Sequence, residues 1–297
     1  MKKFIILIVV IFLLSSTIAA FAQEKKEITV GAKNFTEQYI LGNIMSILLE
    51  NNGFTVSEKF GTGSAITREG LVTGQTDLYA EYTGTASLVY LKHEEVITDP
   101  VKLFNKVKTE DLEKNGIVWL DRSNINNTYA IALTKEQVAK IGSTLSELAK
   151  YVNQNHDLIW GIDHEFAERA DGLPGLAEHY GMNIDKKNIK TMDVGLTYEA
   201  LNRGQTDITM VFATDGKIKK YGLQVLKDDQ QFFPVYNICV NVREEVLNKY
   251  PEIREILKPI SELDDETMTE LNYQVDAIGL PAKLVAKNFL REKGYIE

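Results

Sequence analysis

The sequence predicts an α/β protein of two lobes with a cleft between them. Three features indicate this fold class. Short apolar strands alternate with amphipathic helices from residue 28 onward. A segment of the first half of the chain recurs in the second half. Two long apolar strands flanked by polar breaks lie where the chain can pass from one lobe to the other.

The alternation is clearest in the first part of the chain. The expected elements are strand, helix, strand, helix and strand over residues 28–31, 39–51, 54–60, 65–73 and 78–82. Apolar residues recur at helical spacing in the first helix, which Asn52 and Gly53 end. Ser64 is the expected N-cap of the second helix. This order is typical of a sheet covered by helices.

The repeat relates Leu71–Leu78 to Leu201–Ile208, and Leu, Gly, Gln, Thr and Asp are identical in the two copies. An aromatic residue stands eleven positions after each leading leucine, at Tyr82 and at Phe212. The two copies are much further apart than the about 20–50 residues of a repeat array. The repeat therefore predicts two lobes of related topology.

The two expected crossovers lie near residues 121 and 230. Lobe I would then comprise residues 23–121 and 231–297, and lobe II residues 122–230. Because the chain would pass twice between the lobes, the crossovers would form a hinge. Ligands of open α/β sheets bind beyond the carboxyl ends of the strands, so the cleft is the expected binding site.

The charge of the chain argues against a nucleic-acid partner. The 297 residues include 42 acidic and 33 basic side chains, giving a net charge of -9. Phosphate contacts require clustered lysine and arginine. The single cysteine, Cys239, lies in an apolar run and is expected to be a small buried side chain. Core packing rather than disulfides is expected to hold the fold together.

Residues 1–22 have the pattern of a secretory signal peptide. Two lysines precede an apolar run, and an Ala-Phe-Ala sequence ends at Ala22. The apolar run, Phe4–Leu14, is shorter than the about 20 residues that span a bilayer. Since no cysteine lies near the cleavage point, we expect an unlipidated periplasmic protein.

The sequence contains no recognisable catalytic motif. Its four histidines lack metal-ligand spacing, and Gly61–Ser64 lacks the lysine of a P-loop and the third glycine of a dinucleotide fingerprint. We therefore expect no catalytic residue, no metal and no cofactor. The same turn offers backbone N–H groups at a helix N-terminus, where a ligand carboxylate could bind.

Four aromatic residues are expected to approach the cleft. Tyr82 and Phe212 end equivalent strands, and Tyr129 and Tyr236 lie close to the two crossovers. A quaternary ammonium group forms no hydrogen bonds and is recognised by aromatic faces. These four rings are thus candidates for a cation cage, although an ordinary packing role is the alternative for any one of them.

Several motifs resemble those of one transport family. They occur in family order along the whole mature chain: Val30–Gln38, Glu81–Thr85, Gly161–Phe166, Asp171–Leu176, Thr214–Gly216 and Asp228–Pro234. The chain resembles the osmoprotectant ABC-transporter substrate-binding proteins for glycine betaine, carnitine and choline. This resemblance implies a type II periplasmic-binding fold, whose two lobes close on a ligand and deliver it to a membrane permease. We expect a monomer.

The resemblance also implies the roles of individual residues. In the family, four tyrosines form the cage, and they fall on Tyr82, Tyr129, Phe212 and Tyr236. Phe212 departs from the tyrosine that family members commonly carry, so the ring is kept and a hydroxyl is lost. Cation attraction is expected to remain, because phenylalanine still presents a π face.

The resemblance places the donors for a ligand carboxylate at Gln38 and Thr85, with backbone N–H groups of nearby turns as helpers. Choline-restricted relatives carry an acidic residue at the position of Thr85, so Thr85 favours betaine-type ligands.

Two alternatives stay open at this stage. The first is a binding protein of the same fold for another small ligand, such as an amino acid, a sulfated compound or a polyamine. The second is a periplasmic enzyme, against which the missing nucleophile, base and metal cluster argue. The first alternative depends on whether the four aromatic residues meet in one pocket.

Overall fold

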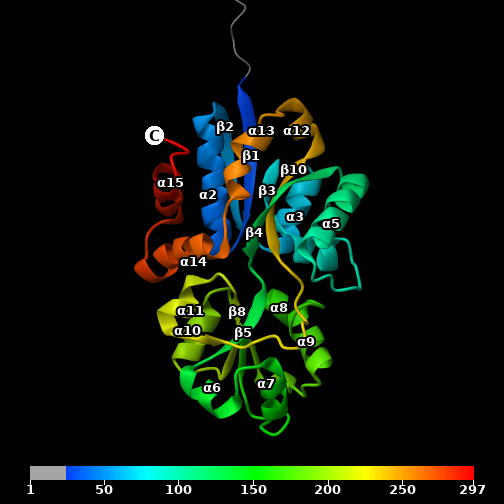
Figure 1. The fold of residues 1–297 in the computed structure, drawn as a ribbon, viewed down its shortest axis with the longest axis vertical. Coiled ribbons are helices and arrows are strands. Elements are labelled where there is room, and N and C mark those ends of the chain that lie inside the picture. Colours follow the sequence, from blue (N-terminus) through cyan, green and yellow to red (C-terminus); the bar gives the residue numbers. More distant parts are fainter. Residues whose placement is uncertain (1–24) are drawn as a thin grey trace, which may run out of the picture.

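Two five-stranded sheets organise residues 25–297, the part of the chain that this computed structural model describes. Each sheet carries its own helices, and the two lobes lie one above the other with two chain segments passing between them (Figure 1). The expected signal peptide, residues 1–22, lies outside the described residues. The expectation of an α/β protein of two lobes is confirmed.

Lobe I is built on the sheet with strand order β2-β1-β3-β10-β4. The strands are β1 Lys26–Lys33, β2 Phe54–Thr62, β3 Leu78–Tyr82, β4 Ile117–Asn126 and β10 Asn237–Arg243. Strands β1, β2 and β3 are parallel, whereas β10 runs antiparallel to both β3 and β4. A strand from the second half of the chain thereby completes the first lobe.

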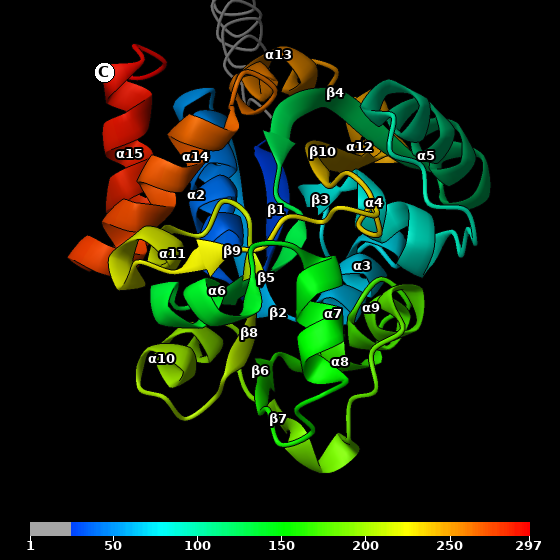
Figure 2. The same ribbon diagram turned by 60° about the horizontal axis from the view of Figure 1, so that its bottom comes forward.

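Helices cover both faces of this sheet, as Figure 2 shows. One face carries α2 Thr36–Asn51, α13 Ile253–Ile256, α14 Asp265–Tyr273 and α15 Ala282–Glu292, and the other carries α3 Ser64–Val72 and α5 Pro100–Asn115. The short helices α4 Thr83–Thr85 and α12 Glu244–Lys249 follow β3 and β10. Because strand side chains alternate, Val118 packs into the first layer and Trp119 into the second.

Lobe II is built on the sheet with strand order β7-β6-β8-β5-β9. The strands are β5 Tyr129–Leu133, β6 Trp160–Ile162, β7 Ile189–Thr191, β8 Ile208–Phe212 and β9 Gln224–Val225. Strands β6, β7 and β8 are parallel, and β5 is antiparallel to β8. The buried Trp160 opens β6, near the middle of this sheet.

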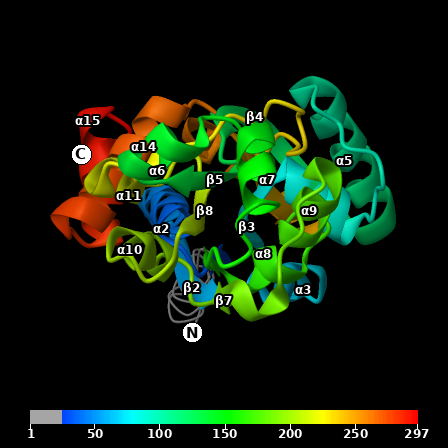
Figure 3. The ribbon, with the colours of Figure 1, turned by 90° about the horizontal axis from the view of Figure 1, so that it is seen from below.

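Six helices surround the sheet of lobe II: α6 Lys135–Ile141, α7 Leu145–Val152, α8 His164–Glu168, α9 Leu173–Tyr180, α10 Leu196–Asn202 and α11 Gly216–Tyr221. Figure 3 shows α10 and α11 on one side of the lobe and α8 and α9 on the other. Capping boxes begin α6 and α7, where Thr134 and Thr144 bond the backbone of Gln137 and Glu147.

The sequence repeat marks the same structural device in both lobes. The Oδ2 atom of Asp77 accepts the N–H of Thr29 at 2.7 Å, and Asp77 N donates to Thr29 O at 2.8 Å. Asp207 makes the matching pair with Ile159, both at 2.8 Å. In each lobe the aspartate that precedes the third parallel strand fixes the backbone of the first. This shared role accounts for the aspartate in both copies of the repeat.

The chain changes sheet at two places. Asn127 and Thr128 separate β4 from β5, and residues 226–236 separate β9 from β10. Two helix starts differ from the expectation. Helix α2 begins at Thr36 and not at residue 39, and α3 begins at Ser64 itself, with Gly63 at the N-cap and no side-chain cap. Cys239 is fully buried in β10, as expected. Among residues 25–297, none of the helices has the length and apolar character needed to cross a bilayer.

A buried ion pair ties together the elements on one face of the lobe I sheet. The Nη1 atom of Arg68, on α3, donates to Oδ2 of Asp111, on α5, at 2.9 Å, and a second bond joins Nη2 to Oδ1. The indole N–H of Trp119, on β4, donates to Asp111 Oδ2 at 2.7 Å. Removing the carboxylate would leave these donors buried without a partner.

We therefore predict that Asp111→Ala lowers the free energy of unfolding by about 3–5 kcal/mol, the usual cost of breaking a buried ion pair. Lys114→Ala is the control, because Lys114 forms an exposed ion pair on the same helix, which is worth less than about 1 kcal/mol. Urea denaturation of the three proteins measures both values. Equal stability of the two variants would contradict the prediction.

Candidate ligand-binding site

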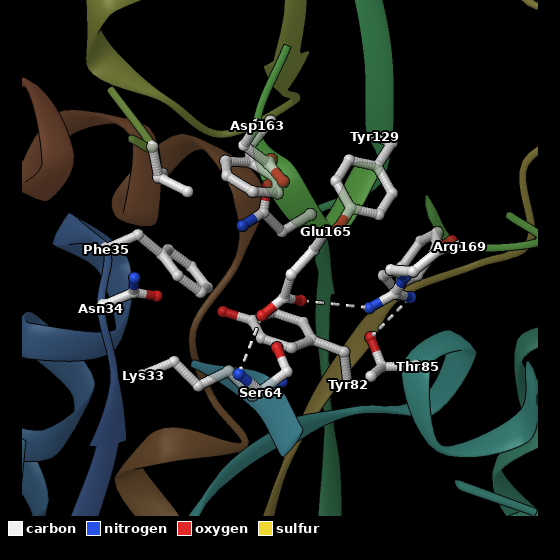
Figure 4. A pocket seen from close by; sticks show the side chains of 14 residues that line it. Lys33, Asn34, Phe35, Ser64, Tyr82, Thr85, Tyr129, Asp163, Glu165 and Arg169 are labelled. Carbon is white, nitrogen blue, oxygen red and sulfur yellow. Dashed lines mark hydrogen bonds and ion pairs between the residues drawn. The ribbon is translucent and has the colours of Figure 1, made fainter. Parts of the chain in front are cut away.

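A pocket lies between the two lobes and encloses about 470 Å³ of empty space, its mouth included. Side chains of both lobes and of the first crossover line it, and most of them are labelled in Figure 4. The lining residues are Lys33, Asn34, Phe35, Ser64, Tyr82, Thr85, Asn127, Tyr129, Asp163, Glu165, Arg169, Val194, Phe212 and Tyr236. Aromatic rings with a few polar side chains are a lining typical of small-molecule sites.

Five aromatic rings form a continuous arc around the pocket. The ring centroids of neighbours lie 6.1 Å apart for Tyr82 and Phe35, 5.1 Å for Phe35 and Phe212, 5.3 Å for Phe212 and Tyr129, and 5.8 Å for Tyr129 and Tyr236. The structure thus brings together the four rings singled out from the sequence. It adds Phe35, which joins the lobe I ring of Tyr82 to the lobe II ring of Phe212.

The ends of the strands and their pairing bring these rings to the same pocket. Tyr82 ends β3 and Phe212 ends β8, and Phe212 is the register partner of Tyr129 on the antiparallel strand β5. Tyr236 immediately precedes β10 and packs against Gly84. A Cβ at Gly84 would lie 2.8 Å from two carbons of the Tyr236 ring. The glycine of Glu81–Thr85 therefore makes room for a ring from a distant part of the chain.

Gln38 does not line the pocket. Its Nε2 atom donates to Ala80 O at 2.9 Å and to the hydroxyl of Tyr82 at 3.1 Å, and its Oε1 accepts the N–H of Lys33 at 3.2 Å. Gln38 faces the sheet from the first turn of α2, where a buried amide needs such partners. Gln38 thus contacts Tyr82 through the hydroxyl of that ring and lies outside the pocket. The other five of the six residues singled out from the sequence line the pocket together.

The N-terminus of α3, which we expected to be free for a ligand carboxylate, is bonded to a carboxylate of the protein. The N–H of Ser64, the first residue of α3, donates to Glu165 Oε1 at 2.9 Å, which joins lobe I to lobe II. Glu165 also pairs with Arg169 at 3.6 Å, and Arg169 Nη2 lies 3.5 Å from the hydroxyl of Thr85. Figure 4 shows this chain of contacts as dashed lines. Thr85 therefore lies beside a guanidinium group.

Arg169 is held in place from several sides. Its Nε and Nη2 atoms donate to the two carboxylate oxygens of Asp171 at 2.7 and 2.5 Å. Its guanidinium lies 5.3 Å from the ring centroid of Tyr129, and the hydroxyl of Tyr236 donates to Asp171 Oδ2 at 2.5 Å. Burial raises the pKa of both tyrosines well above the usual value, so their hydroxyls stay neutral. This cluster links the second crossover to lobe II.

Glu165 and Arg169 were not singled out from the sequence, although signals for both were present. Glu165 stands inside the motif Gly161–Phe166, and Arg169 lies between that motif and Asp171–Leu176. Their roles depend on contacts with Ser64 and Thr85 of the other lobe, which a local pattern does not reveal. Phe35 lies inside the motif Val30–Gln38, and the sequence pattern alone does not distinguish it from its neighbours.

One buried carboxylate connects the pocket to the crossover and to both lobes. Glu37, in the first turn of α2, accepts four hydrogen bonds. The hydroxyl of Tyr82 and Nδ2 of Asn127 donate to its Oε1 at 2.7 and 2.9 Å, and the hydroxyl of Thr214 and Nδ2 of Asn272 donate to its Oε2 at 2.5 and 3.3 Å. These donors come from β3, the first crossover, the turn after β8 and α14.

Burial raises the pKa of Glu37 above its usual value of 4.5, although each of the four hydrogen bonds lowers it. The folded protein therefore holds a proton on this carboxyl more tightly than the unfolded chain does. The contribution of this proton to stability is complete below pH 4.5 and is lost as the pH rises through the raised pKa.

We predict that Glu37→Gln removes this pH dependence. Relative to the unsubstituted protein, the variant should gain stability between about pH 4 and about pH 7.5, because glutamine does not ionise. Urea denaturation at the two pH values measures the change. Glu199→Gln is the control, because the side chain of Glu199 on α10 is 41% exposed. A difference that is the same at both pH values would contradict the prediction.

Comparison with known proteins shows the family. Residues 26–292 match the model of the substrate-binding domain of ABC-type glycine betaine transport systems. A glycine-betaine-binding protein of Pseudomonas aeruginosa is 39% identical over 282 residues, which cover 92% of this chain and 90% of that protein. An ergothioneine transport permease/ergothioneine binding protein of Helicobacter pylori is 38% identical over 92% of this chain, which spans 49% of that longer protein.

Solved structures agree with this result. A crystal structure described as a glycine betaine/carnitine/choline ABC transporter superimposes with a TM-score of 0.73 at 30% identity, over 92% of this chain and 100% of the other. Apo YehZ from Escherichia coli gives a TM-score of 0.66, also at 30% identity, over 92% of this chain and 100% of that one. The chain therefore belongs to the family of substrate-binding domains of ABC-type glycine betaine transport systems.

Proposed function

We propose that this protein is the extracytoplasmic solute-binding component of an ABC importer for quaternary-ammonium compatible solutes of the glycine betaine, carnitine and choline type. The observation that carries the proposal is the arc of five rings, which draws on both lobes. Each ring that faces a desolvated cation contributes about 0.5–2 kcal/mol. The family is one of transport proteins rather than enzymes.

The polar side of the pocket supplies donors for a ligand carboxylate. Arg169 and the hydroxyl of Thr85 lie together, and the carboxylate of Glu165 joins Arg169 to the N–H of Ser64. Glu165 already accepts from Ser64, so a ligand carboxylate competes with a protein carboxylate for these donors. Gln38 acts indirectly, since its amide holds the hydroxyl of Tyr82.

The proposed mechanism is closure of the lobes on the ligand. A ligand that contacts Tyr82 and Phe212 touches both lobes, so it binds the closed form better than the open form and shifts the equilibrium towards closure. Membrane permease subunits of the importer would then recognise the closed form. We further propose that the mature protein acts in the periplasm as a monomer, after removal of residues 1–22.

The ligand of the Helicobacter pylori relative gives a second candidate within the same chemistry, because its printed name assigns it ergothioneine, which is also a trimethylammonium betaine. A ligand without a quaternary ammonium group, such as an amino acid or a polyamine, is the remaining alternative. It would leave the arc of apolar faces without a function.

Calorimetric titration of residues 23–297 with glycine betaine and then with choline tests the proposed function. We expect saturable one-to-one binding of at least one of these compounds. Binding of neither, together with binding of a primary-amine ligand such as putrescine or an amino acid, would overturn the proposal.

We predict that Tyr82→Ala and Tyr236→Ala each weaken binding of the preferred quaternary ammonium ligand at least about tenfold, because a ring contributes on the order of 0.5–2 kcal/mol and its loss also opens the pocket. Tyr82→Phe is the matched control, since it keeps the ring and loses only the bonds to Glu37 and Gln38. Thermal unfolding checks that each variant folds. Unchanged affinity in a folded alanine variant would contradict the cage.

For Thr85→Val, we predict a loss of about fivefold in glycine betaine affinity, which corresponds to one net hydrogen bond of roughly 1 kcal/mol. Choline has no carboxylate, so its affinity should change less than about twofold by the same reasoning. Both constants come from the same titrations. An equal loss for the two ligands would show that Thr85 shapes the pocket and does not bind the carboxylate.

A further inference from the structure

Asp163 lines the pocket and carries a buried carboxylate oxygen that has no hydrogen-bond partner among residues 25–297. Its Oδ1 atom accepts the N–H of Phe166 at 2.8 Å and so caps α8. Its Oδ2 atom is buried and receives no hydrogen bond from residues 25–297. The whole residue is only 2% exposed, and it lines the pocket between the lobes. Figure 4 shows it beside Tyr129.

The cost of this arrangement calls for a compensating partner. A buried carboxylate oxygen without a hydrogen bond costs about 1–3 kcal/mol or more. Burial raises the pKa of Asp163, although the backbone N–H groups of Phe166 and Glu165 lower it. The other buried carboxylates around the pocket have full sets of partners, as Glu37 and Asp171 show. Capping α8 needs only one oxygen, which serine, threonine or asparagine supplies equally well.

We propose that Asp163 Oδ2 accepts a hydrogen bond from the bound ligand, so that this protein selects quaternary ammonium compounds that also carry an O–H or N–H donor. The inference rests on the proposed function and narrows it. Glycine betaine consists of methyl groups, a methylene group and a carboxylate, and it offers no donor to this oxygen. A hydroxylated or azole-bearing betaine does.

The position of Asp163 defines where that donor must lie. Asp163 follows β6 on the lobe II side of the pocket and is close enough to raise the pKa of Tyr129 through its charge. The donor group therefore lies on the side of the ligand that faces lobe II, near the ring of Tyr129. Thr85 and Ser64 approach the pocket from lobe I, which leaves them to the carboxylate.

A second explanation makes a different prediction. The carboxylate of Asp163 would also attract the ammonium charge itself, and that attraction is the same for every quaternary ammonium ligand of similar size. A selection for donors requires two ligands that differ only in the donor to bind differently. The comparison must therefore be made within matched pairs of ligands.

The experiment titrates the unsubstituted mature protein and Asp163→Asn with two matched pairs. One pair is carnitine and γ-butyrobetaine, which differ by one hydroxyl. The other pair is histidine betaine and its derivative methylated at the single ring N–H. In this derivative a methyl group replaces the N–H donor. Glycine betaine is titrated alongside them. Asparagine keeps the cap of α8 and turns the free acceptor into a donor.

We expect the unsubstituted protein to prefer the donor-bearing member of at least one pair by tenfold or more, a difference of about 1.4 kcal/mol. Asp163→Asn should reduce this preference below about threefold, because an amide N–H faces the ligand donor. Asp99→Asn is the control, since Asp99 caps α5 in the same way at an exposed site. It should leave every affinity unchanged.

Each remaining outcome has a definite meaning. Equal binding within both pairs, or a preference that Asp163→Asn leaves intact, overturns the selection for donors while quaternary ammonium binding stands. If Asp163→Asn lowers the affinity for all ligands equally, Asp163 acts by attracting the ammonium charge, and the inference is also overturned. If no quaternary ammonium compound binds, the proposed function itself fails. Asp163→Ser, which also caps a helix, replaces Asp163→Asn if the latter does not fold.

Discussion

The pocket depends on the buried carboxylate of Glu37. Four donors from separate parts of the chain converge on it, and one of them is the hydroxyl of Tyr82, a ring of the aromatic arc. Asn127 brings the first crossover to the same point, and Thr214 lies two residues beyond Phe212. A carboxyl group is suited to this position because its two oxygens can accept several hydrogen bonds. The relative placement of the rings thus rests on one acceptor.

Two glycines near the pocket allow close contacts between distant parts of the chain. Gly84 leaves room for Tyr236, and Gly216 lets the start of α11 meet the backbone of Tyr273 in α14. The second contact joins lobe II to the C-terminal part of lobe I. Both positions have ordinary negative backbone angles, so the requirement for glycine comes from the neighbouring atoms and not from the conformation of the chain.

Much of the fold could be predicted from the sequence, because its signals are local. The periodicity from residue 28 to 82 gave five elements in the right order, and Asp77 and Asp207 repeat because each clamps a neighbouring strand. The meeting of Tyr82, Tyr129, Phe212 and Tyr236 in one pocket could also be predicted, since strand ends and crossovers carry these rings. The position of Gln38 could not be predicted, because a residue in the first turn of a helix can face either the cleft or the sheet. Glu165 and Arg169 act through contacts between lobes, which no sequence window contains.

The two tryptophans of the chain are divided between the lobes. Trp119 lies in the lobe I sheet with its N–H on Asp111, and Trp160 lies in the lobe II sheet, both with an exposed fraction of 1% or less. Neither lines the pocket between the lobes. Intrinsic tryptophan fluorescence consequently reports on the integrity of each lobe, and a single-tryptophan protein made by replacing either residue would follow the unfolding of one lobe by itself.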